Sequence, residues 1–240
     1  MDITPVTKQA RRLLKLKYCG AVIVAAGTAS RMGGVDKIME PLNGEPLVVH
    51  SLRAFETCDA IREIVVVTRP DLIVPIMSLC APFKKVTAVV AGGENRPDSV
   101  DKGLNALSAK VKLAAIHDGA RPLISWQVID RVVRAANSFG AAAPGIPVKD
   151  TIKKVNGGIV TETPERKQLS AIQTPQVFDF DLLRGALKKA RQDGAELTDD
   201  CSAVERLGFK VKIVEGDERN LKVTTPLDLR IAKLLLEEQA

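Results

Sequence analysis

The chain has 240 residues, of which 45% are hydrophobic, 3% aromatic and 27% charged, and its formal net charge is +6. This is the composition of a globular protein with a buried core, and no apolar run reaches the roughly 20 residues that a membrane-spanning helix needs. The scarcity of aromatic residues argues against a surface that stacks nucleic-acid bases, whereas the positive charge fits either an anionic substrate or a lysine-rich surface.

The expected elements alternate along the chain from residue 20 onward. Short, β-branched apolar runs predict strands, and apolar residues at helical spacing predict helices. The first strands are expected at 21–26, 61–68, 86–91 and 113–116, and the first helices at 46–57, 99–107 and 126–137. This alternation predicts an α/β fold with a Rossmann-like, mostly parallel sheet flanked by helices and joined by right-handed crossovers.

The alternation stops near residue 150. The following segment contains Asn156-Gly157-Gly158 between short strand-like pieces, and Asn-Gly is a strong hairpin signal. We therefore predict that residues 150–172 form a β-arm that projects from the sheet. Helices are then expected at 180–190 and 200–207, a strand at 210–214 and a closing helix at 226–237, capped by Thr225 with Pro226 at its first position. The whole chain, 1–240, is expected to form a single domain.

The four cysteines are scattered, with no CxxC pair and no histidine at the spacing of a metal ligand; they are Cys19, Cys58, Cys80 and Cys201. We expect buried, free thiols in a reducing compartment. The basic start of the chain is followed by an apolar run of strand length only, so we expect no signal peptide and a cytoplasmic protein.

Polar and glycine-rich residues gather where the predicted strands end, which is where open α/β sheets bind ligands. The first such segment is residues 25–37, AAGTASRMGGVDK. Ala25, Ala26 and Gly27 allow a ligand to approach the backbone closely, while Arg31 and Lys37 add positive charge. The segment matches neither the Walker loop nor the dinucleotide fingerprint. The alternative is a flexible strand-to-helix loop that carries two solvated cations.

Further segments follow the first loop in a fixed order. They are GGENRPDSV at 92–100, HDGARP at 117–122, DTIK at 150–153, QTPQVF at 173–178, TDD at 198–200 and NLKVT at 220–224. With the AAGxxxRM pattern of the first loop, this set resembles the 2-C-methyl-D-erythritol 4-phosphate cytidylyltransferase family of sugar-phosphate nucleotidyltransferases, from about residue 20 to the C-terminus. Ala29 and Asp36 depart from it, because the family often has Gly and Pro at these positions.

The resemblance implies an enzyme of non-mevalonate isoprenoid biosynthesis that transfers CMP from CTP to 2-C-methyl-D-erythritol 4-phosphate. The products are 4-diphosphocytidyl-2-C-methyl-D-erythritol and pyrophosphate, and Mg²⁺ is the expected cofactor. A ribitol-5-phosphate cytidylyltransferase, with the same chemistry, is the nearest alternative. A transferase that uses UTP and a non-catalytic nucleotide- or nucleic-acid-binding protein are the more distant ones.

The roles of the nucleotide-side residues follow from this resemblance. Both reactants are anions, so the site needs fixed cations to hold them and to stabilise charge on the transferred phosphoryl group. Arg31, Lys37 and Lys222 are therefore assigned to the triphosphate and the transition state. Asp118 would hold Mg²⁺, directly or through water, or bind the ribose. The segment predicted to read the cytosine consists of Gly92, Gly93, Asn95 and Ser99, although it could equally be an ordinary strand-to-helix turn.

The second substrate is expected to meet the arm. By resemblance, the sugar-phosphate contacts are Thr151, Arg166, Thr174 and Thr198. Arg166 could form a bidentate clamp on the phosphate. The resemblance also implies a homodimer held by the arm at 150–172, so that Arg166 could serve the site of the neighbouring subunit. We expect structural roles for Arg121, paired with Asp118, and for the two histidines of the chain, His50 and His117.

Overall fold

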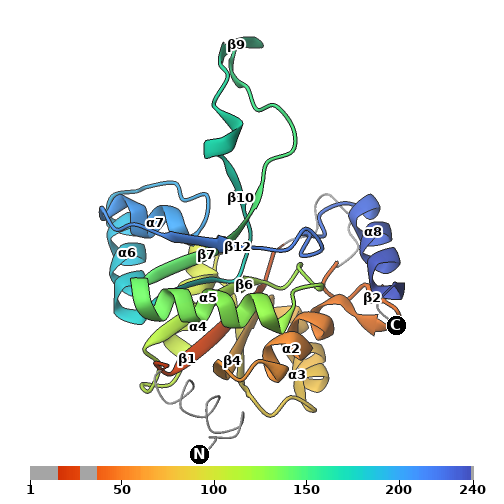
Figure 1. The fold of residues 1–240 in the computed structure, drawn as a ribbon. Coiled ribbons are helices and arrows are strands. Elements are labelled where there is room, and N and C mark those ends of the chain that lie inside the picture. The colour runs from red at the N-terminus through yellow and green to blue at the C-terminus, as the bar shows by residue number, and fades with distance from the viewer. Residues whose placement is uncertain (1–15, 28–36, 239–240) are drawn as a thin grey trace, which may run out of the picture.

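The computed structural model describes residues 16–27 and 37–238. In this part of the chain, an eight-stranded sheet has the order β10-β7-β11-β6-β1-β4-β5, and β12 pairs with the other edge of β7 (Figure 1). Its strands are β1 (Cys19–Ala25), β4 (Ile61–Thr68), β5 (Val86–Ala91), β6 (Leu113–Asp118), β7 (Ala141–Pro147), β10 (Ser170–Ile172), β11 (Gln176–Asp179) and β12 (Lys212–Glu215).

The helices of the described residues follow the strands. They are α2 (Leu47–Thr57), α3 (Ile73–Cys80), α4 (Arg96–Ala106), α5 (Trp126–Phe139), α6 (Phe180–Gln192), α7 (Asp200–Arg206) and α8 (Pro226–Glu237), with short 3-10 turns η2 (Pro70–Leu72) and η3 (Arg166–Gln168). Two small hairpins, β2 (Pro41–Leu42) with β3 (Glu45–Pro46) and β8 (Lys154–Asn156) with β9 (Ile159–Glu162), lie outside the main sheet.

The sheet is mostly parallel, as the sequence predicts. Strands β5, β4, β1 and β6 run parallel to one another, and β12 runs parallel to β7. Strand β11 is inserted antiparallel between β6 and β7. The expected strands and helices are present with small shifts of their ends, whereas β2, β3, β7, β11 and α3 have no counterpart among the predictions.

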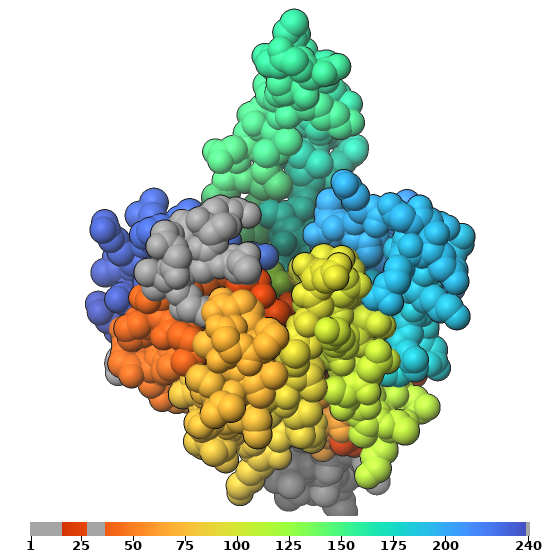
Figure 2. All heavy atoms as spheres, turned by 180° about the vertical axis from the view of Figure 1, so that it is seen from behind, coloured from red at the N-terminus to blue at the C-terminus, as the bar shows by residue number. Residues whose placement is uncertain are grey.

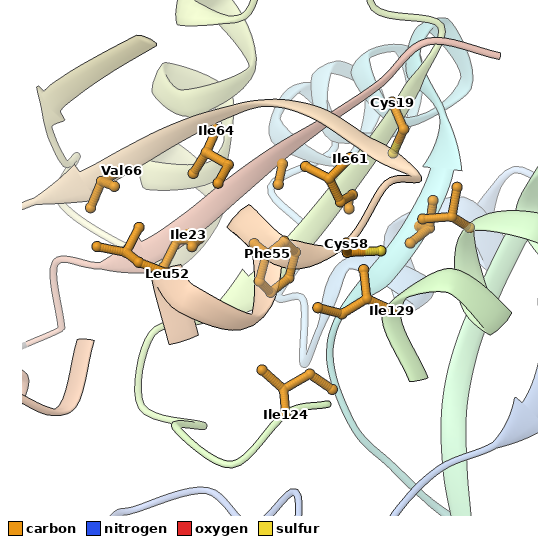
Figure 3. Packing of buried hydrophobic residues seen from close by; sticks show 14 of the residues in the cluster. Cys19, Ile23, Leu52, Phe55, Cys58, Ile61, Ile64, Val66, Ile124 and Ile129 are labelled. Atoms are coloured by element: carbon orange, nitrogen blue, oxygen red, sulfur yellow. The ribbon is translucent and has the colours of Figure 1, made fainter. Parts of the chain in front are cut away.

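Two apolar layers cover the sheet because successive side chains of a strand point to opposite faces. On β1, Ala21 and Ile23 contact the layer formed by α2, α3 and α5, and Val22 contacts the layer formed by α4, α6 and α7. Figure 3 shows the first layer, where the rings and branched chains of Phe55, Ile129 and their neighbours pack around Cys58. Aliphatic side chains thus form most of the core, as the low aromatic content predicts.

The arm projects away from the sheet (Figures 1 and 2). Its tip is the β8–β9 hairpin, where Gly157 and Gly158 adopt positive φ values of 57° and 82°. The last three residues of the predicted segment, 170–172, form β10 and pair with β7, so they belong to the main sheet. The projecting part therefore ends before β10.

The C-terminal helix α8 begins as its sequence predicts. The Thr225 side chain accepts a hydrogen bond from the Asp228 backbone N–H, and Asp228 reciprocates in a capping box, with Pro226 in the first turn. All four cysteines are free and buried, which confirms the prediction for their thiols. In the described ranges, no helix combines the length and the apolar character that spanning a membrane requires.

Candidate active site

The carboxyl ends of four strands meet at one edge of the sheet. In the pairing register, Ala25 lies beside Thr68, Thr68 lies beside Ala91, and Val24 lies beside Asp118. The loops that leave these ends surround a pocket of about 420 Å³. It is lined by Val24, Ala25, Ala26, Gly27, Lys37, Ile38, Arg69, Gly93, Glu94, Asn95, Arg96, Ser99, Asp118, Ala120 and Lys222.

Two glycines allow close packing around the β5–α4 loop, and Gly92 brings this loop against Ala26 of the first loop. A Cβ atom on Gly92 would collide with the side chains of Ala26 and Ser99, and one on Gly93 would overlap Asp98. The Gly92 N–H also donates to the Thr68 carbonyl at 2.7 Å. A side chain at Gly92 would force the two loops apart, and one at Gly93 would push against the first turn of α4, so the glycines set the shape of the pocket wall.

The start of α4 is held by its own polar side chains. Asn95 is the N-cap and accepts from the Asp98 N–H at 2.9 Å. The buried Ser99 hydroxyl accepts from the Gly93 N–H at 3.0 Å and donates to the Asn95 carbonyl at 3.0 Å. Both residues thus hold the turn that forms the pocket wall, and helix α4 begins at Arg96 rather than at 99 as predicted. Their contact with a base stays a prediction.

Asp118 is the buried carboxylate of the pocket, and three cations surround it. Its Oδ2 lies 2.8 Å from Lys222 Nζ and 3.8 Å from Arg121 Nε, and its Oδ1 lies 3.3 Å from Arg96 Nη2. Burial alone would raise the pKa of Asp118, but the charges of Arg96 and Lys222 outweigh it and lower the pKa below its ordinary value. Asp118 is therefore ionised and locked in place, and its predicted pairing with Arg121 is confirmed.

A buried network supports Asp118 from beneath. The Thr174 hydroxyl accepts from the Asp118 N–H at 3.1 Å and lies 3.0 Å from His117 Nδ1, while His117 Nε2 lies 3.3 Å from the Arg121 carbonyl. Burial lowers the pKa of His117 to about 3, so its ring is neutral at physiological pH. The hydroxyl of Thr174 is thus engaged in this network rather than in the pocket lining, and His117 has the structural role that was expected.

The predicted site residues divide into three groups, apart from Thr174 and from Gly92, which lies beside the pocket wall but is not among the lining residues. Lys37, Lys222 and Asp118 line one pocket together with Ala25, Ala26, Gly27, Gly93, Asn95 and Ser99. Arg31, Ala29 and Asp36 lie outside the described residues. Thr151 and Arg166 are on the exposed arm, where Arg166 Nη1 donates to the Lys149 carbonyl at 2.8 Å, and Thr198 is exposed just before α7. This pocket lining does not include the last three.

The pocket also contains charged residues to which the motifs assign no role. Arg96 bridges Asp118 to the buried Asp200, which its Nη2 contacts at 2.8 Å. Arg69 and Glu94 also line the pocket. Arg96 and Asp200 fall inside two of the recognised segments, GGENRPDSV and TDD, but they are 104 residues apart in the chain. Only the fold brings them together.

Comparison with known proteins places these segments in a wider context. A family model described as 2-C-methyl-D-erythritol 4-phosphate cytidylyltransferase matches residues 19–238. A protein of that name from Caldanaerobacter subterraneus subsp. tengcongensis is 43% identical over 227 residues, covering 91% of this chain and 98% of its own. Another from Geobacillus kaustophilus is 45% identical over 219 residues, covering 90% and 96%.

Solved structures agree with the sequence relatives. The crystal structure of 4-diphosphocytidyl-2C-methyl-D-erythritol synthase from Anaerococcus prevotii superposes with a TM-score of 0.86 at 29% identity, covering 94% of this chain and 99% of that one. The 2-C-methyl-D-erythritol 4-phosphate cytidylyltransferase of Thermus thermophilus gives a TM-score of 0.75 at 33% identity, with 90% and 98% covered. The mixed, mostly parallel sheet flanked by helices is therefore shared with these proteins.

Proposed function

The chain belongs to the 2-C-methyl-D-erythritol 4-phosphate cytidylyltransferase family, and on this premise we propose how the pocket around Asp118 performs the reaction. A member of this family is a CTP-dependent enzyme that transfers CMP to 2-C-methyl-D-erythritol 4-phosphate and releases pyrophosphate. The names of the relatives do not favour the ribitol-phosphate alternative. The observation that carries the residue-level proposal is the joint placement of Lys37, Lys222 and Asp118 at the carboxyl ends of the parallel strands.

The reaction needs positioned charge more than proton transfer. A phosphate oxygen of the sugar-alcohol phosphate attacks the α-phosphorus of CTP, and the bond to pyrophosphate breaks. Because that oxygen is already ionised at neutral pH, no general base is required. We assign Lys37 and Arg31 to the triphosphate and to the negative charge that grows on the α-phosphate oxygens, and we propose that Lys222 joins them in this role from the far side of the site.

The nucleotide would bind in the pocket, against the wall that the two glycine-containing loops form. The backbone of Ala25, Ala26 and Gly27 would face the phosphates, and that of Gly92 and Gly93, with Asn95 and Ser99, would face the cytosine. Backbone and side-chain hydrogen bonds to the base edge would discriminate cytosine from other bases, since a wrong base would leave those groups unpaired. The narrow fit at the glycines supports this arrangement.

Mg²⁺ is the proposed cofactor, with Asp118 as its protein contact. No cluster of three or more His, Cys, Asp or Glu side chains suited to a metal occurs among the described residues. This fits an ion that takes most of its ligands from phosphate oxygens and water, with one ionised carboxylate from the protein. Bound there, Mg²⁺ would neutralise part of the triphosphate charge. Asp118 itself fixes the positions of Lys222 and Arg96 around the reacting groups.

The catalytic proposal can be tested by pyrophosphate release from the purified protein. CTP and Mg²⁺ would be supplied with 2-C-methyl-D-erythritol 4-phosphate or with ribitol 5-phosphate, and UTP and ATP would replace CTP as controls. We expect release only with CTP and the methylerythritol phosphate, and a large loss of turnover in Lys222→Met. Release only with ribitol 5-phosphate would show that this is the substrate instead of the methylerythritol phosphate. Full turnover in Lys222→Met would refute the role of that residue.

We also propose that the arm forms a homodimer. Four of its apolar side chains are exposed in the monomer, with 72% of Ile159 and 57% of Val155 accessible; they are Ile152, Val155, Ile159 and Val160. Replacing Val155, Ile159 and Val160 with serine should shift the protein to monomers in sedimentation experiments. The matched control is Val74→Ser on α3, because Val74 is also 72% exposed. A dimer that survives the arm substitutions would contradict the assignment.

A dimer would allow Arg166 to act on the neighbouring subunit's substrate, with Thr151 and Thr198 as further sugar-phosphate contacts. Mixing two inactive variants, Lys222→Met and Arg166→Gln, tests this directly. If Arg166 acts in trans, a mixed dimer contains one site with both residues intact, and activity returns. If it acts within its own chain, the mixture stays inactive. Cytoplasmic location and the lack of a nucleic-acid partner remain predictions from the sequence.

A further inference from the structure

We propose that Arg96, anchored by Asp200, is a positioning residue that makes the binding of the two substrates cooperative. The proposal rests on the function given above and extends it to two residues to which neither the sequence nor the comparisons give a role. Arg96 is the first residue of α4 and Asp200 the first residue of α7. Their ion pair joins the helix at the nucleotide side of the site to the helix at the sugar-phosphate side.

The geometry of Arg96 is that of a bridge. Its Nη2 donates to Asp200 Oδ2 at 2.8 Å and to Asp118 Oδ1 at 3.3 Å, and its Nε lies 3.4 Å from the same Asp118 oxygen. The Asp200 side chain is 2% exposed and that of Arg96 is 29% exposed. Burial opposes the charge of the guanidinium, but the two carboxylates raise the pKa of Arg96 above its ordinary value. The guanidinium of Arg96 is thus permanently charged, and the buried Asp200 holds it at the pocket wall.

The start of α7 is rigidly tied to the sheet. Gln176, on β11, accepts hydrogen bonds from the backbone N–H groups of Asp200 and Cys201, both at 3.0 Å. The amide of Gln176 also donates to the N-cap residue, Asp199, at 2.7 Å. The residue before this N-cap is Thr198, the predicted sugar-phosphate contact. A displacement of Asp200 would therefore move the α7 end that carries Thr198.

The start of α4 is tied equally well to the nucleotide pocket. Asn95 and Ser99 form the capped turn at the pocket wall, and Arg191 of α6 contacts Asp98 of the same turn at 2.7 Å. Figure 2 shows the yellow-green segment with α4 beside the light-blue segment with α6 and α7. A nucleotide that fixes the α4 turn would fix Arg96, and through Asp200 it would fix the α7 end in the geometry that the second substrate needs.

The consequence is a coupling between two ligands, which is reciprocal by thermodynamic linkage. Binding of the nucleotide should tighten binding of the sugar-alcohol phosphate by about tenfold, within the common range for such coupling. A lysine in place of Arg96 keeps the charge but has no planar fork with which to hold both carboxylates. If Arg96 contributes only its positive charge, the coupling should persist in Arg96→Lys. If Arg96 acts by bridging the two carboxylates, the coupling should be lost.

The experiment measures affinities rather than turnover. Titration calorimetry would give the Kd of 2-C-methyl-D-erythritol 4-phosphate with and without Mg²⁺ and α,β-methylene CTP, a non-reactive analogue. We expect the roughly tenfold tightening in the unmodified protein, and its loss in Arg96→Lys and Asp200→Asn. The control is Arg53→Lys, since Arg53 holds Glu45 through two contacts of 2.8 and 2.7 Å at an exposed position outside the pocket.

Two results would overturn the inference. One is independent binding of the two ligands to the unmodified protein, and the other is coupling that persists in Arg96→Lys. Should Asp200→Asn fail to fold, Arg96→Lys alone decides the question. Failure of the unmodified protein to bind α,β-methylene CTP at all would instead refute the proposed function, so the two failures are distinguishable.

Discussion

Replacing Asp118 with asparagine should lower the stability of the protein and leave the site with an excess of positive charge. The substitution keeps the shape of the side chain but removes the negative charge that faces three cations at 2.8, 3.3 and 3.8 Å. Removal of one partner from a buried ion-pair cluster leaves uncompensated charge, at a cost of about 3 kcal/mol at the low end of such changes. For a chain of this size, that cost corresponds to a melting temperature lower by roughly 6–12 °C.

The assay combines thermal unfolding with pyrophosphate binding. In the Asp118→Asn protein, Lys222 and Arg121 lose their carboxylate and Arg96 keeps only Asp200. Added pyrophosphate should therefore bind at least as tightly as before and recover much of the lost stability, while turnover falls strongly. Asp193→Asn is the control, because Asp193 also contacts two cations, Lys189 at 2.6 Å and Arg206 at 3.5 Å, but at an exposed position. Unchanged melting of Asp118→Asn, or weaker pyrophosphate binding, would refute the reasoning.

Three further predictions concern the loops and the buried histidine. Lys37→Ala and Arg31→Ala should each lose most turnover while circular dichroism shows an intact fold; near-normal turnover in both would contradict their roles. Gly93→Ala should weaken CTP binding because its Cβ would overlap Asp98, whereas Gly185→Ala on α6, where a Cβ has open space, should raise the free energy of unfolding by about 0.5–1 kcal/mol. Burial lowers the pKa of His117 from 6.5 to about 3. Between these two pH values, His117 is protonated in the unfolded chain but neutral in the folded one. Stability should therefore fall between pH 6.5 and pH 3, by at most about 1.4 kcal/mol per pH unit from this group, and urea unfolding at pH 6 and pH 4.5 should show a smaller fall in His117→Gln.

The elements that could be predicted from the sequence are those whose local hydrophobic pattern matches their burial in the folded protein. Strands β1, β4 and β6 each contain an uninterrupted apolar run, at 21–25, 64–67 and 113–116, and they form the buried centre of the sheet. Strand β7 has no predicted counterpart because its sequence, AAAPGIP, contains two prolines and a glycine, which are unusual in strands. The structure explains the glycine: a Cβ on Gly145 would collide with Ser170 of β10 and Ile213 of β12, which flank it. Packing between neighbouring strands, which no local pattern records, selects this residue.

Helix α3 was missed for a related reason. Its sequence, IVPIMSLC, is apolar apart from Ser78 and contains Pro75, so it shows no clear helical spacing of apolar residues and includes a residue that usually interrupts helices. The proline lies in the first turn, where its missing N–H has no helical partner to lose. The helix is short, and contacts with α2 and β5 supply the stability that its sequence does not.

The candidate site was predictable in outline but not in its internal pairing. Strand ends and glycine-rich loops indicated which segments meet, because carboxyl ends of parallel strands lie at one edge. The partners of Asp118 were not predictable, apart from Arg121 three residues away. Thr174 shows the limit most clearly: its segment was recognised correctly, but only the antiparallel insertion of β11 beside β6 places its hydroxyl under the Asp118 backbone.

The pairing around Asp118 has a consequence for the order of events in catalysis. Lys222 is assigned to the substrate phosphates, but in the structure it donates to Asp118 at 2.8 Å. A phosphate that enters the pocket must therefore compete with this carboxylate for the ammonium group. Lys222 can move from Asp118 to the phosphate at low cost only if Asp118 keeps other cations as partners. Arg96 and Arg121 both contact it and fill this role. Three cations around one carboxylate thus allow one of them, Lys222, to be shared with substrate without leaving a buried charge unpaired.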